Sequence, residues 1–159
     1  SKIKNLKFKI INYETAKNTI KEKFKEFKKF HLLSAGKSTR PNKTWEIMLK
    51  KIYDNEANLF YLDLDGKSVS FLYCAKFFDF AWGWSQVNLK KYENISPRHF
   101  LEWQAMKYYK DNHFHSYEIG ERFYPQEKFK PTIKELSISE FKEKYGSDRY
   151  PKAFFRIEV

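Results

Sequence analysis

The stretch that offers the most chemistry lies at residues 96–99, where a helix is predicted to begin beside several cations. Ser96 suits the N-cap and Pro97 the first helical position, because proline lacks the N–H that a helix start leaves unpaired. The free backbone N–H groups and the positive end of the helix dipole attract anions. The basic side chains clustered around this start are Lys90, Lys91, Arg98 and His99. A pyrophosphate would be well compensated here, and an ordinary capped helix beside exposed charges fits the same residues equally well.

Other kinds of catalytic chemistry find little support. Five glycines are few, and no Walker-type or dinucleotide-type phosphate loop is present. His113 and His115 have the spacing that points two side chains the same way along a strand, but no cysteine or third histidine lies near them, so no metal site is predicted. Cys74 sits among apolar neighbours, and no stretch resembles the turn that exposes a serine nucleophile.

The elements that must position these residues follow from the periodicity of apolar side chains. Alternation predicts strands over 6–11, 58–64, 67–78, 80–87, 115–120 and 153–159, with a hairpin turn at Asp65-Gly66. Helical spacing predicts helices over about 14–33, from residue 42 with Asn42 or Thr44 as N-cap, from Ser96, and before Gly146 with Ser137 and Glu140 as capping box. The order β-α-α-β-β-β-α-β-α-β predicts one α+β domain over residues 1–159, a mixed, mostly antiparallel sheet flanked by helices.

Composition and charge narrow the class of protein. The 159 residues are 42% apolar and 19% aromatic, which excludes a disordered chain, and no apolar stretch is long enough to span a membrane. A single cysteine fits a reducing, cytoplasmic setting. The net charge of +11 favours an anionic partner: nucleic acid, a membrane surface or a phosphorylated cofactor. Much of the lysine lies between the helically spaced Ile20, Phe24, Phe27 and Phe30, where it forms a solvated helix face.

Three segments resemble the FemAB-like branch of the GNAT acyltransferase superfamily. The run 100–107 (FLEWQAMK), followed by 117–120 (YEIG), is similar to the helix "LL-W-A-K-A-G" and the strand end "F-D-x-G" of that branch. Residues 31–41 (HLLSAGKSTRP) resemble its loop between the first two helices, and residues 141–146 (FKEKYG) resemble its signature near the end. The resemblance spans nearly the whole chain, and the predicted order of elements is that of a GNAT fold.

The resemblance implies acyl transfer from acyl-CoA, with acetyl-CoA as the first candidate, to an amine acceptor such as an amino sugar of a bacterial surface glycan. In that fold the fourth and fifth strands diverge and the acyl-CoA inserts between them. The pantetheine amides would then pair with residues 82–88, including Val87 and Asn88. The pyrophosphate would lie on the helix start formed by Ser96, Pro97, Arg98 and His99. The glycine-containing phosphate loop common in GNAT proteins is absent, since residues 90–96 contain no glycine.

For the reaction, the resemblance implies a base for the amine and an acid for the leaving thiolate. Glu118 and Glu121, near the end of the fifth strand, are the first candidate bases, Asp79 before the fourth strand is a further one, and Tyr124 is the candidate acid. Arg40 would match a carboxylate or phosphate of the acceptor. The remaining predicted substrate-binding residues are His31, Trp84 and Ser85.

Two other functions stay open on the sequence, and the missing glycine loop also leaves open a GNAT relative without catalytic activity. A Fem-like transferase would take its acyl group from aminoacyl-tRNA, but Fem transferases carry two such domains and a coiled-coil arm. A non-catalytic module for RNA or another anionic partner needs rings and cations interleaved on an exposed sheet face, whereas most rings here fall at core positions. We therefore expect an acyl-CoA-dependent N-acetyltransferase with a small-molecule amine acceptor, no nucleic-acid partner, and a homodimer as the candidate assembly.

Overall fold

The structure is a computed structural model that describes residues 5–121, 123–126, 130–145 and 148–149. The chain divides into two compact units, with the boundary between Ile119 and Gly120. Among the described residues, the first unit holds five strands and three long helices, and the second holds the helix α4 (Ile133–Glu143). The expectation of one domain over residues 1–159 stays a prediction, and the strand expected at 153–159 lies outside the described residues.

The first unit is built on a five-stranded sheet in the order β1-β2-β3-β4-β5. Antiparallel pairing joins β1 (Leu6–Ile11), β2 (Ala57–Leu64), β3 (Lys67–Phe77) and β4 (Phe80–Asn88), and β5 (Ser116–Glu118) pairs parallel with β4. The expected turn joins β2 to β3, with φ of 52° at Asp65 and 79° at Gly66, the backbone of a tight hairpin. The predicted α+β class with a mixed, mostly antiparallel sheet is confirmed.

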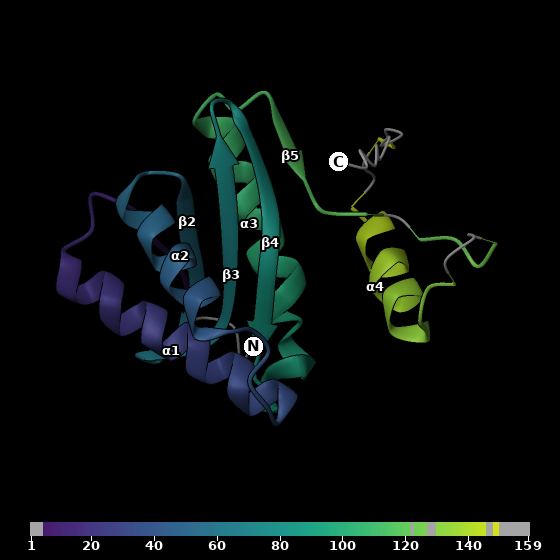
Figure 1. The fold of residues 1–159 in the computed structure, drawn as a ribbon, viewed down its shortest axis with the longest axis horizontal. Coiled ribbons are helices and arrows are strands. Elements are labelled where there is room, and N and C mark those ends of the chain that lie inside the picture. The colour runs from purple at the N-terminus through teal and green to yellow at the C-terminus, as the bar shows by residue number, and fades with distance from the viewer. Residues whose placement is uncertain (1–4, 122, 127–129, 146–147, 150–159) are drawn as a thin grey trace, which may run out of the picture. The chain divides into compact units, whose positions relative to one another are not determined.

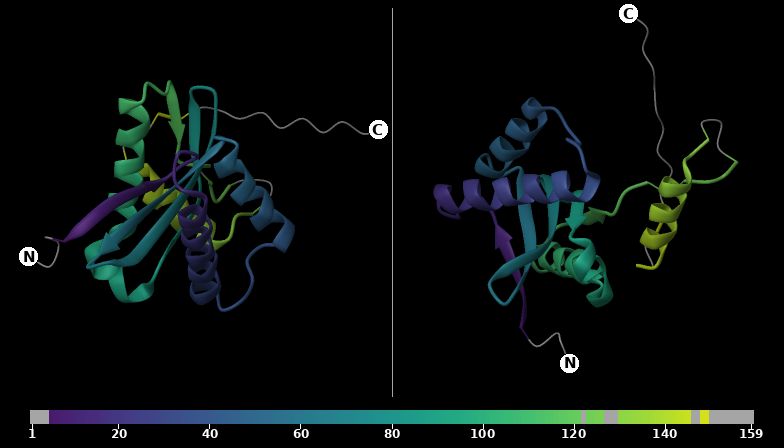
Figure 2. Two further views of the ribbon diagram at one scale, coloured as in Figure 1. Left: turned by 90° about the vertical axis from the view of Figure 1, so that its left-hand side faces the viewer. Right: turned by 90° about the horizontal axis from the view of Figure 1, so that it is seen from below.

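The sheet is covered on both faces. The helices α1 (Lys17–Ala35) and α2 (Asn42–Tyr53) lie on one side and α3 (Pro97–Asp111) on the other (Figures 1 and 2). The predicted apolar stripe of α1 is buried and packs, with Trp45 of α2, on the aromatic side chains of Phe71 and Tyr73 of β3. On the opposite face Leu101 and Ala105 of α3 pack on Leu72. Two separate hydrophobic cores therefore fix the sheet between the helix layers.

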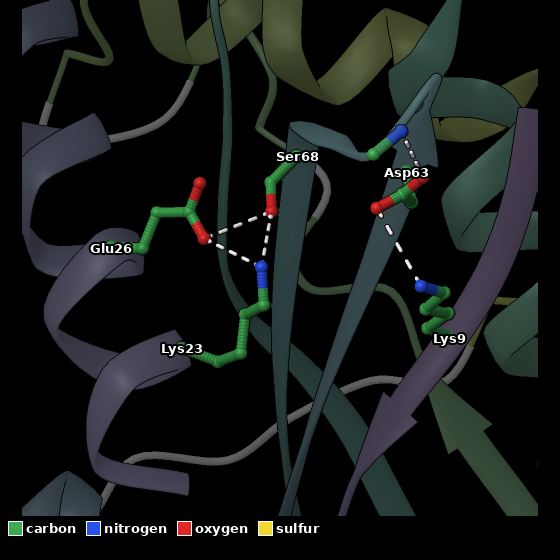
Figure 3. Close-up of polar contacts among 6 residues, drawn as sticks. Lys9, Lys23, Glu26, Asp63 and Ser68 are labelled. Carbon is green, nitrogen blue, oxygen red and sulfur yellow. Dashed lines mark hydrogen bonds and ion pairs between the residues drawn. The ribbon is translucent and has the colours of Figure 1, made fainter. Parts of the chain in front are cut away.

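Polar contacts tie the N-terminal half of α1 to the sheet (Figure 3). Lys23 Nζ donates to Glu26 Oε2 at 2.8 Å and to Ser68 Oγ at 3.0 Å, and Ser68 Oγ donates to the same Glu26 oxygen at 3.0 Å. Ser68 belongs to β3, so this cluster fixes α1 along the strands.

The start of α1 and the caps of α2 and α4 differ from the sequence prediction, whereas α2 begins at residue 42 as predicted. The helix expected from residue 14 begins at Lys17, because Asn12 and Thr15 exchange side-chain and backbone hydrogen bonds in a turn that competes with the helix. The expected caps of α2 are wrong: Pro41 occupies the N-cap, and Asn42 is already helical, with its side-chain oxygen accepting from Lys28 Nζ at 3.0 Å.

The helix α4 starts earlier than its expected capping box at Ser137 and Glu140. A second motif of the same form lies upstream, where Thr132 Oγ1 accepts from the Glu135 N–H at 3.2 Å and Glu135 Oε2 accepts from the Thr132 N–H at 2.7 Å. The upstream box begins the helix, so Ser137 and Glu140 fall inside it and the predicted cap is wrong. Residues Lys90–Ile95 form a 3-10 helix, η1, that the sequence did not predict.

Candidate active site where β4 and β5 diverge

The strands β4 and β5 pair over only three residues. Phe80 faces Ser116, Ala81 faces Tyr117 and Trp82 faces Glu118, and there the ladder ends. From Gly83 to Asn88, no strand of the described residues pairs with β4 on this side. The unpaired stretch offers backbone N–H and C=O groups to an extended ligand, as any sheet edge does.

A β-bulge lies at the beginning of this open edge. Tyr73 of β3 faces Ser85 and Cys74 faces Gly83, which leaves Trp84 as an extra residue on β4. A bulge increases the local twist and takes the extra residue out of the ladder. The Trp84 ring is 43% exposed and lies edge-on to Tyr73, with 5.7 Å between ring centroids.

Backbone alternation decides which groups of β4 face the open edge. The Leu89 N–H donates to Val69 O of β3 at 3.4 Å. In an antiparallel ladder alternate residues turn their polar groups to the same neighbour, so Val87 also directs its groups to β3. Gln86 and Asn88 direct theirs to the open edge. The sequence prediction covered residues 82–88 and singled out Val87 and Asn88, because only the strand register reveals which residues face the open edge.

The predicted anion site at the start of α3 lies beside β4. Gln86 Nε2 donates to the Arg98 carbonyl oxygen at 2.9 Å, which fixes the first turn of α3 against the strand. Ser96 occupies the N-cap as predicted, but its φ is 48° and its side chain makes no cap hydrogen bond within the described part of the chain. Ser96 and Arg98 are exposed, His99 is half-buried and Pro97 is buried. Lys90 and Lys91 of η1 are exposed as well.

A buried polar pair that the sequence did not reveal lies against β4 at the point of divergence. Tyr117 of β5 donates its hydroxyl proton to Glu102 Oε1 of α3 at 2.5 Å, and Glu102 is only 7% exposed. A Cβ added to Gly83 would lie 2.8 Å from both of these oxygen atoms. The glycine in mid-strand is therefore required for this pair to rest on the β4 backbone, and such a glycine is the one sequence signal that points to it.

The Tyr117–Glu102 pair belongs to a larger group of buried side chains on the face of the sheet that α3 covers. Cys74 Sγ lies 3.5 Å from the Tyr117 hydroxyl, and the Tyr109 ring stacks on the Tyr117 ring at 5.6 Å between centroids. Asn58 Nδ2 donates to the Tyr109 hydroxyl at 3.1 Å. Burial raises the pKa of Tyr117 and of Cys74 well above their usual ranges, so both are protonated near neutral pH. Cys74 is a packed thiol and not a nucleophile.

On the other face of β4, three of the predicted substrate-binding residues meet. Arg40 Nη2 donates to Ser85 Oγ at 2.8 Å, and Ser85 Oγ lies 3.1 Å from His31 Nε2. The residues come from the α1–α2 loop, from β4 and from the C-terminal half of α1. The Arg40 guanidinium also lies over the Trp45 ring of α2, 5.1 Å from its centroid. We call Arg40, Ser85, His31 and Trp45 the Arg40 cluster.

The Arg40 cluster is partly desolvated and positively charged. Burial, followed by the nearby Arg40 charge, lowers the pKa of His31 to about 4, so its imidazole is neutral at pH 7. Burial also lowers the pKa of Arg40. Since Arg40 donates to Ser85 Oγ, the serine proton is free to point at the neutral His31 ring.

The predicted catalytic residues lie in both units. Glu118 ends β5 and is half-buried; strand alternation places it on the face opposite Tyr117, the face that carries the Arg40 cluster. Glu121 and Tyr124 are exposed residues of the second unit. The Tyr124 hydroxyl accepts from Arg149 Nη1 at 3.3 Å, and Arg149 pairs with Glu143. The catalytic roles of all three stay predictions.

Comparison with known proteins identifies the fold. No protein-family model matches the chain, and no curated protein matches it either. Among solved structures it is similar to an aminoglycoside acetyltransferase from an uncultured soil metagenomic sample in complex with sisomicin, with a TM-score of 0.65, 12% identity and 97% of each chain covered. A GNAT family acetyltransferase of Staphylococcus aureus matches with a TM-score of 0.60 and 13% identity over 97% of this chain and 99% of that one. This chain has the GNAT acetyltransferase fold.

A third similar structure adds a ligand of known chemistry. The aminoglycoside N-acetyltransferase AAC(6')-Iy, in complex with the bisubstrate analog CoA-S-monomethyl-acetylneamine, matches with a TM-score of 0.64 and 10% identity over 97% of this chain and 98% of that chain. In the described part of this GNAT-fold chain, no group of three or more His, Cys, Asp and Glu residues is arranged to hold a metal ion. No helix within the same residues is long and apolar enough to cross a membrane.

Proposed function

We propose that the protein is an acyl-CoA-dependent N-acyltransferase, with acetyl-CoA as its donor, that acts on an amine acceptor by direct transfer. The observation that carries the proposal is the open edge of β4, which begins at the Trp84 bulge where β5 turns away. A structurally similar protein was solved with a bisubstrate analog that contains CoA. The proposal includes membership of the FemAB-like branch, which is supported by the three segments of the sequence that resemble it.

The residues at this edge fit the donor. Pantetheine carries two amides, and Gln86 and Asn88 turn backbone groups toward the open edge, beside Val87. The α3 start follows directly, held to the strand by the Gln86–Arg98 hydrogen bond. There Ser96, Pro97, Arg98 and His99 would bind the pyrophosphate, with the exposed cations of η1 alongside.

Direct acyl transfer needs few protein groups. The donor supplies an activated acyl group as a thioester. Backbone N–H groups at the Trp84 bulge would bind the thioester oxygen, because the bulge takes them out of the β3 ladder. Glu118 or Glu121 would accept the amine proton and Tyr124 would protonate the leaving sulfur. His31, Arg40, Trp84 and Ser85 would hold the acceptor, for which an amino sugar is our first choice on the resemblance to the FemAB-like branch.

Thermal unfolding with acetyl-CoA tests the donor. At about 100 times the Kd, binding stabilises the folded chain by about 2.7 kcal/mol. For a chain of this length that is a rise in Tm of about 5 to 10 °C. Arg98→Glu should abolish most of the rise, whereas Lys107→Glu, the same charge change further along α3, should not. No rise in the wild type, or equal losses in both variants, would count against the donor site.

A backbone substitution tests the open edge itself. Asn88→Pro removes one N–H that faces the open edge and leaves the β3 ladder intact. It should weaken acetyl-CoA binding about tenfold, the loss of one hydrogen bond to the ligand. Asn88→Ala keeps the N–H and is the matched control. If the two variants bind acetyl-CoA equally, the donor does not pair with β4.

A further inference from the structure

Arg40 is a half-buried cation with no acidic partner among the residues that the structure describes. Its guanidinium donates to Ser85 Oγ and to Thr39 Oγ1, both neutral groups. No Asp or Glu among the described residues forms an ion pair with it. Since partial burial removes water from the guanidinium without supplying a counter-charge, an anion bound there would be strongly favoured.

The surroundings of Arg40 reinforce its charge. Lys28 Nζ also lies near the Trp45 ring, 6.0 Å from its centroid, so two cations lie close to one aromatic ring. His31 adds no negative charge in either of its protonation states. The cluster would therefore repel a polycationic acceptor and attract an anionic one.

The position of the cluster relates it to the open edge. Ser85 is only 5% exposed and directly follows Trp84, the bulge residue of β4. The acyl group is proposed to lie at this bulge. The hydrogen bond from Arg40 to Ser85 therefore holds the guanidinium next to the proposed acyl position. Arg40 is held in place by Ser85 on one side and by the Trp45 ring on the other. A preorganised guanidinium of this kind suits bidentate binding of a planar or tetrahedral oxyanion.

We infer that the acceptor carries a carboxylate or phosphate group, which Arg40 binds beside Trp45 while the amine reaches β4 near Ser85. This inference rests on the proposed acyl transfer and narrows its acceptor to anionic amines. It also sets this chain apart from the aminoglycoside acetyltransferases that share its fold, since aminoglycosides are polycations. Both carboxylate and phosphate fit the guanidinium, and the test separates them.

Matched amines test the inference on the full chain with CoA bound. L-Alanine against L-alaninamide isolates a carboxylate, and D-glucosamine 6-phosphate against D-glucosamine isolates a phosphate. Calorimetry measures their affinities, and release of free thiol from acetyl-CoA measures their acetylation. In one pair the anionic amine should bind at least about tenfold more tightly, the factor expected for one charge-assisted hydrogen bond. The pair that responds identifies the anion.

Variants of the loop assign the preference to Arg40. Arg40→Gln should remove the preference for the anionic amine, so that the two members of the responding pair bind within about threefold of each other. Arg40→Lys should retain part of the preference for the anionic amine, because an ammonium keeps the positive charge but lacks the two parallel N–H donors of a guanidinium. Lys37→Gln, which removes an exposed cation from the same loop, should leave the preference unchanged.

The outcomes separate the inference from the proposed function. Failure of acetyl-CoA to stabilise the wild type overturns the donor, whatever the amines do. Equal or undetectable binding of both members in both pairs overturns the anionic acceptor while the donor stands. Equal effects of Arg40→Gln and Lys37→Gln overturn it too. So does a loss of kcat after Arg40→Gln that is the same for neutral and anionic amines, because Arg40 would then serve the reaction itself.

Discussion

Adding one methyl group at Gly83 should destabilise the protein strongly, and the sign of the effect tests the buried pair beneath β4. The φ of Gly83 is not in the left-handed region, so its backbone suits any residue. At such a site Gly→Ala normally stabilises a protein by about 0.4 to 1 kcal/mol, since it restricts the unfolded chain. The alanine Cβ, however, would lie 2.8 Å from both Glu102 Oε1 and the Tyr117 hydroxyl.

The size of the stability loss follows from which atoms the new methyl group must displace. Overpacking a buried site costs about 1 to 3 kcal/mol. Moving either oxygen also lengthens a 2.5 Å hydrogen bond to a buried carboxylate, and such bonds contribute about 1.5 to 3 kcal/mol. The two costs share the same atoms and do not add fully, so we expect a net loss of about 2 to 4 kcal/mol. For a chain of this length the Tm falls by about 4 to 16 °C.

Urea unfolding followed by tryptophan fluorescence measures this loss, and a double-mutant cycle assigns it. Tyr117→Phe removes one of the two oxygen atoms that the new methyl group meets. Gly83→Ala should therefore cost at least about 1 kcal/mol less in the Tyr117→Phe background than in the wild type. A Gly83→Ala variant as stable as the wild type, or a coupling energy below about 0.5 kcal/mol, would refute the placement of the Tyr117–Glu102 pair on β4.

Three further predictions concern single groups. His31 has a pKa of about 4 in the folded chain against 6.5 in the unfolded chain. Its contribution to the free energy of unfolding is therefore complete above pH 6.5 and is lost as the pH falls toward 4. Because solvent screens this half-buried site, we expect the free energy of unfolding to fall by about 1 to 2 kcal/mol between pH 7 and pH 5. Urea midpoints at pH 7 and pH 5 should differ less in His31→Gln than in the wild type, and an unchanged difference would contradict the lowered pKa. Cys74 should react with a thiol reagent only slowly until urea is added, because it is buried and its pKa is raised; rapid labelling of the folded chain would count against this. Thr132→Ala should remove the capping box of α4 and cost that helix about 1 kcal/mol, seen as faster amide exchange at Glu135 and Leu136; unchanged exchange would place the helix start elsewhere.

Local patterns in the sequence determined most of the fold. The alternation in 6–11 and 58–64 predicts strands that are present, and the Asp65-Gly66 turn follows from residues that accept positive φ. The apolar stripe of α1 is buried as its helical spacing predicts. These features depend on neighbours within a few positions along the chain. The caps of α2 and α4 differ from the predicted ones because several nearby residues can each cap a helix, and the sequence does not rank them.

The sequence also determined that His31, Arg40 and Ser85 are candidates for one site, and only the tertiary structure decided that they touch. Ser85 lies 54 positions from His31 and 45 from Arg40. The Glu102–Tyr117 pair, the length of the β5 ladder and the bulge at Trp84 left no pattern in the sequence beyond one glycine in mid-strand. Strand register and burial depend on long-range packing of two cores against one sheet. Periodicity reports which face a side chain takes, but not which distant residue meets it there.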